Sequence, residues 1–189
     1  CMVIPAFAEP AVTFPQGTIT SEPTELFSEH FHVSIDAGVY VPGDLMERWE
    51  GIYRAMETVS GIRFEDGAYA RKIEVRCRAN ETSEEGEFYV PVAYQNQIDL
   101  YPADLLANGS YAILHEMSHT LNYFYHEASE DWESRLMAEG FAEYTSYQTA
   151  KWLEENDPAL AYAVGPSQQI LYNVALEEEE TLYTEELSH

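Results

Sequence analysis

The chain of 189 residues is the size of one domain, and its hydrophobic content of 46% excludes a disordered chain. Its 34 acidic residues against 9 basic ones give a formal net charge of −25. A surface of this charge repels phosphate groups, which argues against a nucleic-acid or anionic membrane partner, and it tolerates divalent ions and cationic substrates. The simplest explanation of the charge is solubility or a salty habitat. No apolar run is long enough to span a bilayer, so we expect no membrane insertion of the mature chain.

The N-terminal residues predict the remnant of a secretory signal peptide. Residues 1–8 are apolar and uncharged, and they end in Ala6-Phe7-Ala8, a small-x-small pattern typical of a signal-peptidase site. A second interpretation makes Cys1 the acylated cysteine of a bacterial lipoprotein, although apolar rather than polar residues follow it. Both interpretations predict an extracytoplasmic protein, secreted or on the cell surface. If Cys1 is removed with the signal, Cys77 is expected to be a lone apolar thiol.

The domain is expected to cover residues 29–189, and the sequence leaves open whether the native chain continues further. Residues 9–28 are rich in Pro, Thr, Ser and Glu and predict a linker or loose lead-in. Residues 31–35 alternate between apolar and polar and predict a first strand. A helix is predicted from Asp44 to Gly61, because apolar residues recur at three- and four-residue steps: Leu45, Trp49, Ile52, Met56 and Val59. Further strands are predicted at 62–64, 72–77, 87–93 and 97–101.

The second half of the domain is predicted to be mainly helical. One helix begins near Ser110 and carries an apolar stripe over Ile113, Leu114, Met117, Leu121 and Phe124. A longer helix is predicted over 130–155, with Ser129 as a candidate cap, and Asn156-Asp157-Pro158 ends it. A last helix is predicted over 167–180. A strand-rich half followed by a helical half indicates the α+β class rather than a regular βαβ alternation.

The first predicted helix of this second half contains His115-Glu116-Met117-Ser118-His119. Residues four apart lie on one face of a helix, so both imidazoles can point at one metal ion. Glu116 lies at the edge of that face, where its carboxylate can reach a water on the metal without binding the metal itself. The motif is short enough to arise by chance in so acidic a chain, so a third ligand has to support it.

Glu139 is the candidate for that third ligand, because a catalytic zinc ion takes three protein ligands and keeps one position open. It lies in the longer predicted helix, twenty residues after His119, and two helices joined by a short connection pack antiparallel. The alternative is a surface carboxylate. Gly140, which would allow a close backbone approach, and a run of apolar neighbours favour a buried position instead: Met137, Ala138, Phe141 and Ala142. Glu143 lies on the same face and can accept the second ring N–H of a ligating histidine.

His-Glu-x-x-His followed by Glu-Gly-x-Ala-Glu-Tyr resembles the gluzincin branch of zinc metallopeptidases, specifically the peptidase MA-like domains, over residues 110–150. This resemblance implies a zincin-like fold, in which a small mixed or antiparallel sheet accompanies an active-site helix and a second long helix that carries a ligand. It implies zinc bound by His115, His119 and Glu139. It also implies that Glu116 is the catalytic base and that Glu143 supports a ligating histidine without binding the metal itself.

Two further comparisons with known families refine this resemblance. Metzincins would need Gly and His where this chain has Asn122 and Tyr125, so that branch is excluded, and His126 is interpreted as an exposed or capping residue. Gluzincins also supply a Tyr or His that hydrogen-bonds the oxyanion, well after the third ligand. Tyr172 and Tyr183 are the candidates for this role, and their spacing selects neither.

The predicted reaction is hydrolysis of a peptide bond by a water that one zinc ion activates, with Glu116 as general base. The expected partner is a peptide or protein, which in gluzincins adds as a strand to the sheet edge, here 87–93 or 97–101. Pro91 is compatible with an edge strand. The alternative function is a zincin-fold binding or scaffold module without turnover, whereas a structural zinc site would need four Cys or His ligands.

A weaker metal candidate is formed by His30 and His32, which could lie on one face of a strand; an exposed strand edge is the favoured explanation. The sequence determines neither the substrate, nor endo- versus exopeptidase action, nor the oligomeric state.

Overall fold

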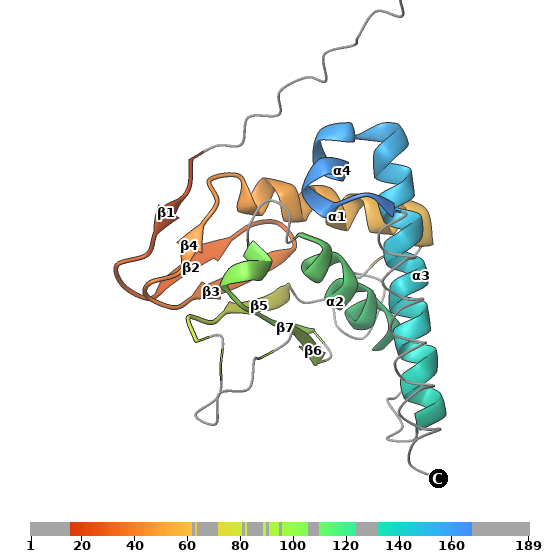
Figure 1. Cartoon of the computed structure of the whole chain (residues 1–189), viewed down its shortest axis with the longest axis horizontal. Helices are drawn as coiled ribbons and strands as arrows, with labels where there is room; N and C mark the ends of the chain where they lie inside the picture. Colours follow the sequence, from red (N-terminus) through yellow and green to blue (C-terminus); the bar gives the residue numbers. More distant parts are fainter. Residues whose placement is uncertain are drawn as a thin grey trace, which may run out of the picture.

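The computed structural model describes residues 16–61, 63, 72–80, 82, 89, 91–94, 96–105, 110–123 and 132–167. Figure 1 shows the strands gathered on one side of the molecule and most of the helical residues on the other. The elements in chain order are β1 (Thr18–Ile19), β2 (Thr24–Phe27), β3 (Phe31–Ile35), β4 (Tyr40–Val41), α1 (Leu45–Ser60), β5 (Ile73–Cys77), β6 (Val92–Tyr94), β7 (Gln97–Leu100), η2 (Pro102–Leu105), α2 (Ser110–Tyr123), α3 (Trp132–Asn156) and α4 (Pro158–Val164).

The main sheet has five strands in the order β2-β3-β5-β7-β6, and β1 pairs separately with β4. β3, β5 and β7 are parallel, while β2 and β6 run antiparallel to their neighbours. Parallel neighbours need a crossover connection, and α1 lies in the connection between β3 and β5. The sheet is therefore mixed and the class is α+β, as the sequence predicts. Of the two segments expected at the edge, β6 ends the sheet and β7 is internal.

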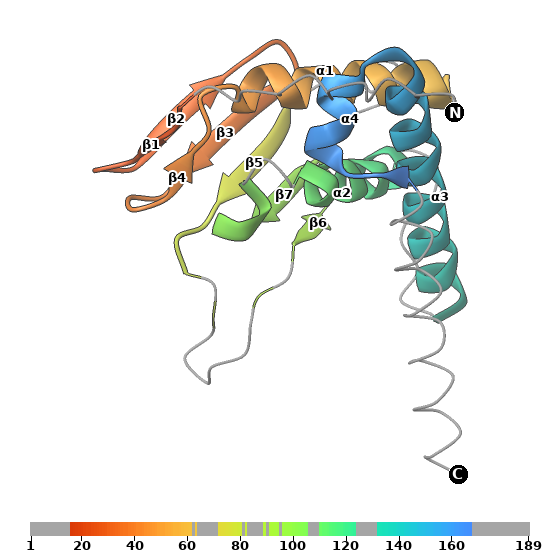
Figure 2. The ribbon, with the colours of Figure 1, turned by 45° about the horizontal axis from the view of Figure 1, so that its top comes forward.

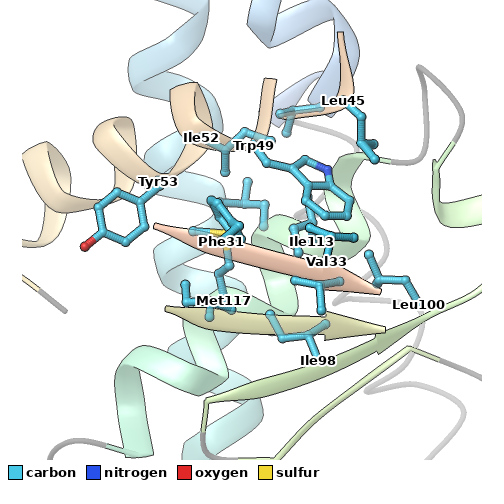
Figure 3. Close-up of a cluster of buried hydrophobic side chains, with 14 of the residues drawn as sticks. Phe31, Val33, Leu45, Trp49, Ile52, Tyr53, Ile98, Leu100, Ile113 and Met117 are labelled. Atoms are coloured by element: carbon cyan, nitrogen blue, oxygen red, sulfur yellow. The ribbon is translucent and has the colours of Figure 1, made fainter. Parts of the chain in front are cut away.

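The core lies between one face of this sheet and the helices. Phe31, Val33 and Ile35 alternate along β3 and are buried, as the period-two pattern predicts. Figure 3 shows Trp49 and Ile52 of α1 over β3, and the ring centroids of Phe31 and Trp49 lie 5.8 Å apart. The predicted helix is thus confirmed over α1, which ends at Gly61 in the left-handed conformation, with a φ of 68°.

Two of the three helices predicted in the second half are also confirmed. α2 buries Ile113, Leu114, Met117 and Leu121, and it packs against β6, β7 and α3. α3 ends at Asn156, and a further helix, α4, follows at once. The side chain of Asp157 caps α4 by accepting a hydrogen bond from the backbone N–H of Leu160 at 3.1 Å. The sequence pattern at 156–158 indicates only the end of a helix, so α4 was not predicted.

The expectation of a loose lead-in over 9–28 is wrong for β1 and β2 (Figure 2). Thr24–Phe27 forms a short edge strand that pairs antiparallel with β3. Only Leu26 packs against the core from this strand, so the apolar signal in the sequence is weak. The strand predicted at 62–64, the start of the one at 87–93 and the helix predicted at 167–180 lie largely outside the described residues. Within the described residues, no helix is long and apolar enough to cross a membrane.

Candidate metal centre

α2 carries both histidines of the motif toward α3, while its apolar residues pack on the sheet. The Nε2 atoms of His115 and His119 lie 3.0 Å apart, and the two ring centroids lie 4.7 Å apart. Their spacing of four residues puts them on one face of the helix. Leu114 and Met117 are fully buried in the core, which fixes the rotation of α2 and so the direction in which the histidines point.

Glu139 of α3 approaches both of these nitrogens with a single oxygen. Its Oε2 lies 3.4 Å from Nε2 of His115 and 3.2 Å from Nε2 of His119. Ligands about 2.1 Å from a tetrahedral zinc ion lie about 3.4 Å from one another, so these three atoms have nearly the separation that a shared ion requires. The donor set, two imidazole nitrogens and one carboxylate oxygen, is also typical of catalytic zinc sites. The residues present therefore fit a metal ion.

Glu143 lies one turn further along α3 and contacts the other nitrogen of His115. Its Oε1 is 3.2 Å from Nδ1 of His115, the contact that the spacing predicts. Its Oε2 accepts a hydrogen bond of 2.6 Å from the hydroxyl of Tyr111. Tyr111 was not among the predicted site residues, although its position four residues before His115 places it on the same helix face.

Glu116 is 94% buried beside the two histidines. Burial is the largest influence and raises the pKa of Glu116 above its ordinary value. The positive charges of the histidines act in the opposite direction, and the negative charges of Glu139 and Asp104 raise the pKa further. A carboxylate with a raised pKa accepts a proton more readily, which is what a general base near neutral pH requires.

The ligand candidates shift one another's pKa values. Burial by itself lowers the pKa of His115, but its hydrogen bonds with Glu139 and Glu143 raise it to about 10. Hydrogen bonds with His115 and His119 lower the pKa of Glu139 to about 2. A metal ion at this position would take the place of the proton, because ligating nitrogens must be deprotonated.

Two expectations about the surroundings of Glu139 are wrong. Its side chain is 60% exposed, and Met137 is 73% exposed, so this turn of α3 is not buried. A Cβ added at Gly140 would meet no atom within 4 Å, so the glycine does not serve a close backbone approach. The helix period explains the error, because Ala142 faces the core whereas Met137 faces outward. The exposure of Glu139 leaves this side of the His/Glu group accessible from solvent.

A second His/Glu group joins α1 to the turn between β2 and β3, where Glu29, His30 and Glu50 bring one ligand atom each within 4.8 Å of one another. Glu50 accepts the backbone N–H of His30 at 2.8 Å and contacts Nδ1 of the same residue at 2.7 Å. Both carboxylate oxygens therefore already have a partner at hydrogen-bond distance. His32 instead contacts Glu74 at 2.6 Å, so His30 and His32 do not share a site.

Several residues named in the sequence analysis lie outside the described residues, namely His126, Ser129, Tyr172 and Tyr183. Comparison with known proteins gives no further indication: no family model matches the chain, and neither curated proteins nor solved structures gave a match.

Proposed function

We propose that this chain is a zinc-dependent peptidase of the gluzincin type, with a zincin-like domain. The observation that carries the proposal is the convergence of His115 Nε2, His119 Nε2 and Glu139 Oε2, with separations of 3.0, 3.2 and 3.4 Å. These separations are close to those of ligands that share one tetrahedral ion. The sequence motif and the order of sheet, α2 and α3 add support for the zincin-like architecture.

Each residue then has a defined task. When bound, the zinc ion would act as a Lewis acid that lowers the pKa of a water and polarises the substrate carbonyl. Glu116 would accept the proton of the attacking water and pass it to the leaving amine. Glu143 would keep the proton of His115 on Nδ1, so that Nε2 can bind the ion.

The sheet edge offers a place for an extended substrate. β6 ends the described sheet on one side, and α2 packs against it. A peptide that pairs with β6 as an additional strand would therefore run past the metal-binding helix. Tyr172 and Tyr183 stay predictions for the oxyanion donor.

The first experiment measures zinc content of the wild type and of Glu139→Ala by elemental analysis. We expect about one ion per wild-type chain and a strong loss in the variant. Glu155→Ala removes an exposed glutamate of the same helix and should keep the ion. Wild-type protein that takes up no zinc, even after zinc is added back, contradicts the proposal.

A second experiment compares hydrolysis of a mixed peptide library by the wild type and by Glu116→Gln. The variant should bind zinc and lose hydrolysis by a factor of about 10² to 10⁴. A variant that cleaves at the wild-type rate contradicts the assignment of the base. Zinc binding by the wild type without turnover of any peptide would instead favour the binding or scaffold module.

A further inference from the structure

The hydroxyl of Tyr111 makes the shortest contact of the candidate metal centre, although this residue is not part of the sequence motif. We propose that Tyr111 is a positioning residue, which holds Glu143 so that Glu143 in turn fixes the ring of His115 with Nε2 toward the metal. The inference rests on the proposed function, because it names a residue that orients one of its ligands.

The two oxygens of Glu143 have separate tasks. Oε2 accepts the hydroxyl proton of Tyr111 at 2.6 Å, and Oε1 faces Nδ1 of His115 at 3.2 Å. The first distance is typical of a strong hydrogen bond to an ionised acceptor. Rotation of the carboxylate about its own axis would break both contacts, so Tyr111 sets the plane in which Glu143 meets the imidazole.

Tyr111 also acts on His115 directly. Its hydroxyl oxygen lies 3.4 Å from Nδ1 of His115. Because the hydroxyl proton is donated to Glu143, the oxygen presents a lone pair to Nδ1, which then has two acceptors in front of it. Two acceptors at Nδ1 keep the proton there and leave Nε2 as the nitrogen that can bind an ion.

These contacts are largely shielded from water, which strengthens them. The side chains of His115 and Glu143 are only 15% and 14% exposed, and hydrogen bonds are electrostatically stronger in such surroundings than in water. Phenylalanine at position 111 would retain the ring and lose only the hydroxyl. Tyr111→Phe therefore separates the proposed role from packing.

The test measures zinc affinity by competition with a chelator for the wild type, Tyr111→Phe, Glu143→Gln and the double variant. We expect Tyr111→Phe to weaken zinc binding about tenfold, within the range found for residues that support metal ligands. The double variant should bind zinc no more weakly than Glu143→Gln, because Tyr111 acts mainly through Glu143.

Tyr144→Phe makes the same change at an exposed tyrosine and should leave the affinity unchanged. Wild-type affinity in Tyr111→Phe, or full additivity of the two losses, would overturn the proposal.

A second readout needs no metal. In the metal-free wild type, the proton on Nδ1 of His115 should exchange slowly with water and give a hydrogen-bonded signal by NMR. Tyr111→Phe should speed this exchange at least severalfold, and Tyr144→Phe should not. An unchanged exchange rate overturns the positioning role. A wild type that binds no zinc but shows this difference defeats the proposed function while supporting the role of Tyr111.

Discussion

Two helices of this protein each carry a glutamate followed by a glycine, and each glutamate meets histidine. On α1, Glu50 is buried, and both of its oxygens are taken up by His30. On α3, Glu139 is 60% exposed, and a single oxygen faces one nitrogen from each of two histidines. The same residue types thus form a buried hydrogen-bonded pair on α1. On α3, an exposed carboxylate faces two histidines.

Both groups bring three possible ligand atoms together, but the distances within them differ. Nδ1 of His30 lies 2.7 Å from Glu50, the length of a strong hydrogen bond. The atoms around Glu139 lie 3.2 and 3.4 Å away, close to the spacing of ligands around one ion. In addition, Glu143 occupies the other nitrogen of His115, which directs Nε2 to the site. Both groups contain histidine and glutamate, so composition does not distinguish them. The contacts of the individual oxygen and nitrogen atoms do.

The largest effect should come from removing one histidine of each group. We expect His119→Ala to weaken zinc binding at least 100-fold, because it removes a ligand and outer residues alone account for 10- to 100-fold. His30→Ala should change zinc affinity less than twofold, whatever it does to stability. Competition with a chelator measures both. If the two variants lose zinc equally, the distinction between the groups is wrong.

The next largest effect concerns stability of the metal-free protein. Glu50→Gln should lower the free energy of unfolding by about 1–3 kcal/mol. Glutamine has one acceptor oxygen where glutamate has two, so the partly buried backbone N–H and Nδ1 of His30 can no longer both be satisfied. Glu139→Gln should cost less than about 1 kcal/mol, because solvent screens this exposed carboxylate. Urea unfolding in the presence of a chelator measures the difference. Equal losses would show that burial does not separate the two glutamates.

Acid should remove the contribution of Glu50. Burial raises the pKa of this carboxyl, but hydrogen bonds with His30 outweigh burial, and the pKa lies below the ordinary value of 4.5. Because the pKa is lowered by folding, the stabilisation is fully present above about pH 4.5 and is lost as the pH falls through the lowered pKa. The stability difference between wild type and Glu50→Gln should therefore be largest near pH 7 and shrink below pH 4.5. Glu47→Gln removes an exposed charge from the same helix and serves as the control. A difference that stays constant down to the lowest pH at which both proteins fold would contradict this account.

Local patterns predicted much of this molecule, and tertiary contacts explain what they missed. Apolar spacing predicted α1, α2 and α3, and the motif with its distant glutamate predicted a group that the structure brings together. Tyr111 shares a helix face with His115, but its hydrogen bond to Glu143 joins two helices and is not visible in a local pattern. β2 was missed because it depends on pairing with β3, while its own residues give only a weak apolar pattern.

The glycines show the same limit. The sequence suggested a close approach at Gly140, where the structure has open space. The close approach occurs at Gly51, where an added Cβ would lie 2.6 Å from Cδ2 of Leu160. Leu160 belongs to α4, the helix that the sequence analysis missed.

The smallest predicted effects come from these two glycines and should have opposite signs. Gly140→Ala should raise the free energy of unfolding by about 0.5–1 kcal/mol, because alanine favours the helix and nothing obstructs its Cβ. Zinc affinity should stay unchanged. Gly51→Ala gains the same helix propensity, but it forces Leu160 to move, and overpacking costs about 1–3 kcal/mol, so we expect a net loss. Urea unfolding of both variants gives the signs, and Leu160→Ala provides the control, since Gly51→Ala should become stabilising in that background. If Gly51→Ala stabilises the protein as much as Gly140→Ala does, Leu160 does not restrict α1. The packing of α4 against α1 is then looser than the contact at Gly51 indicates.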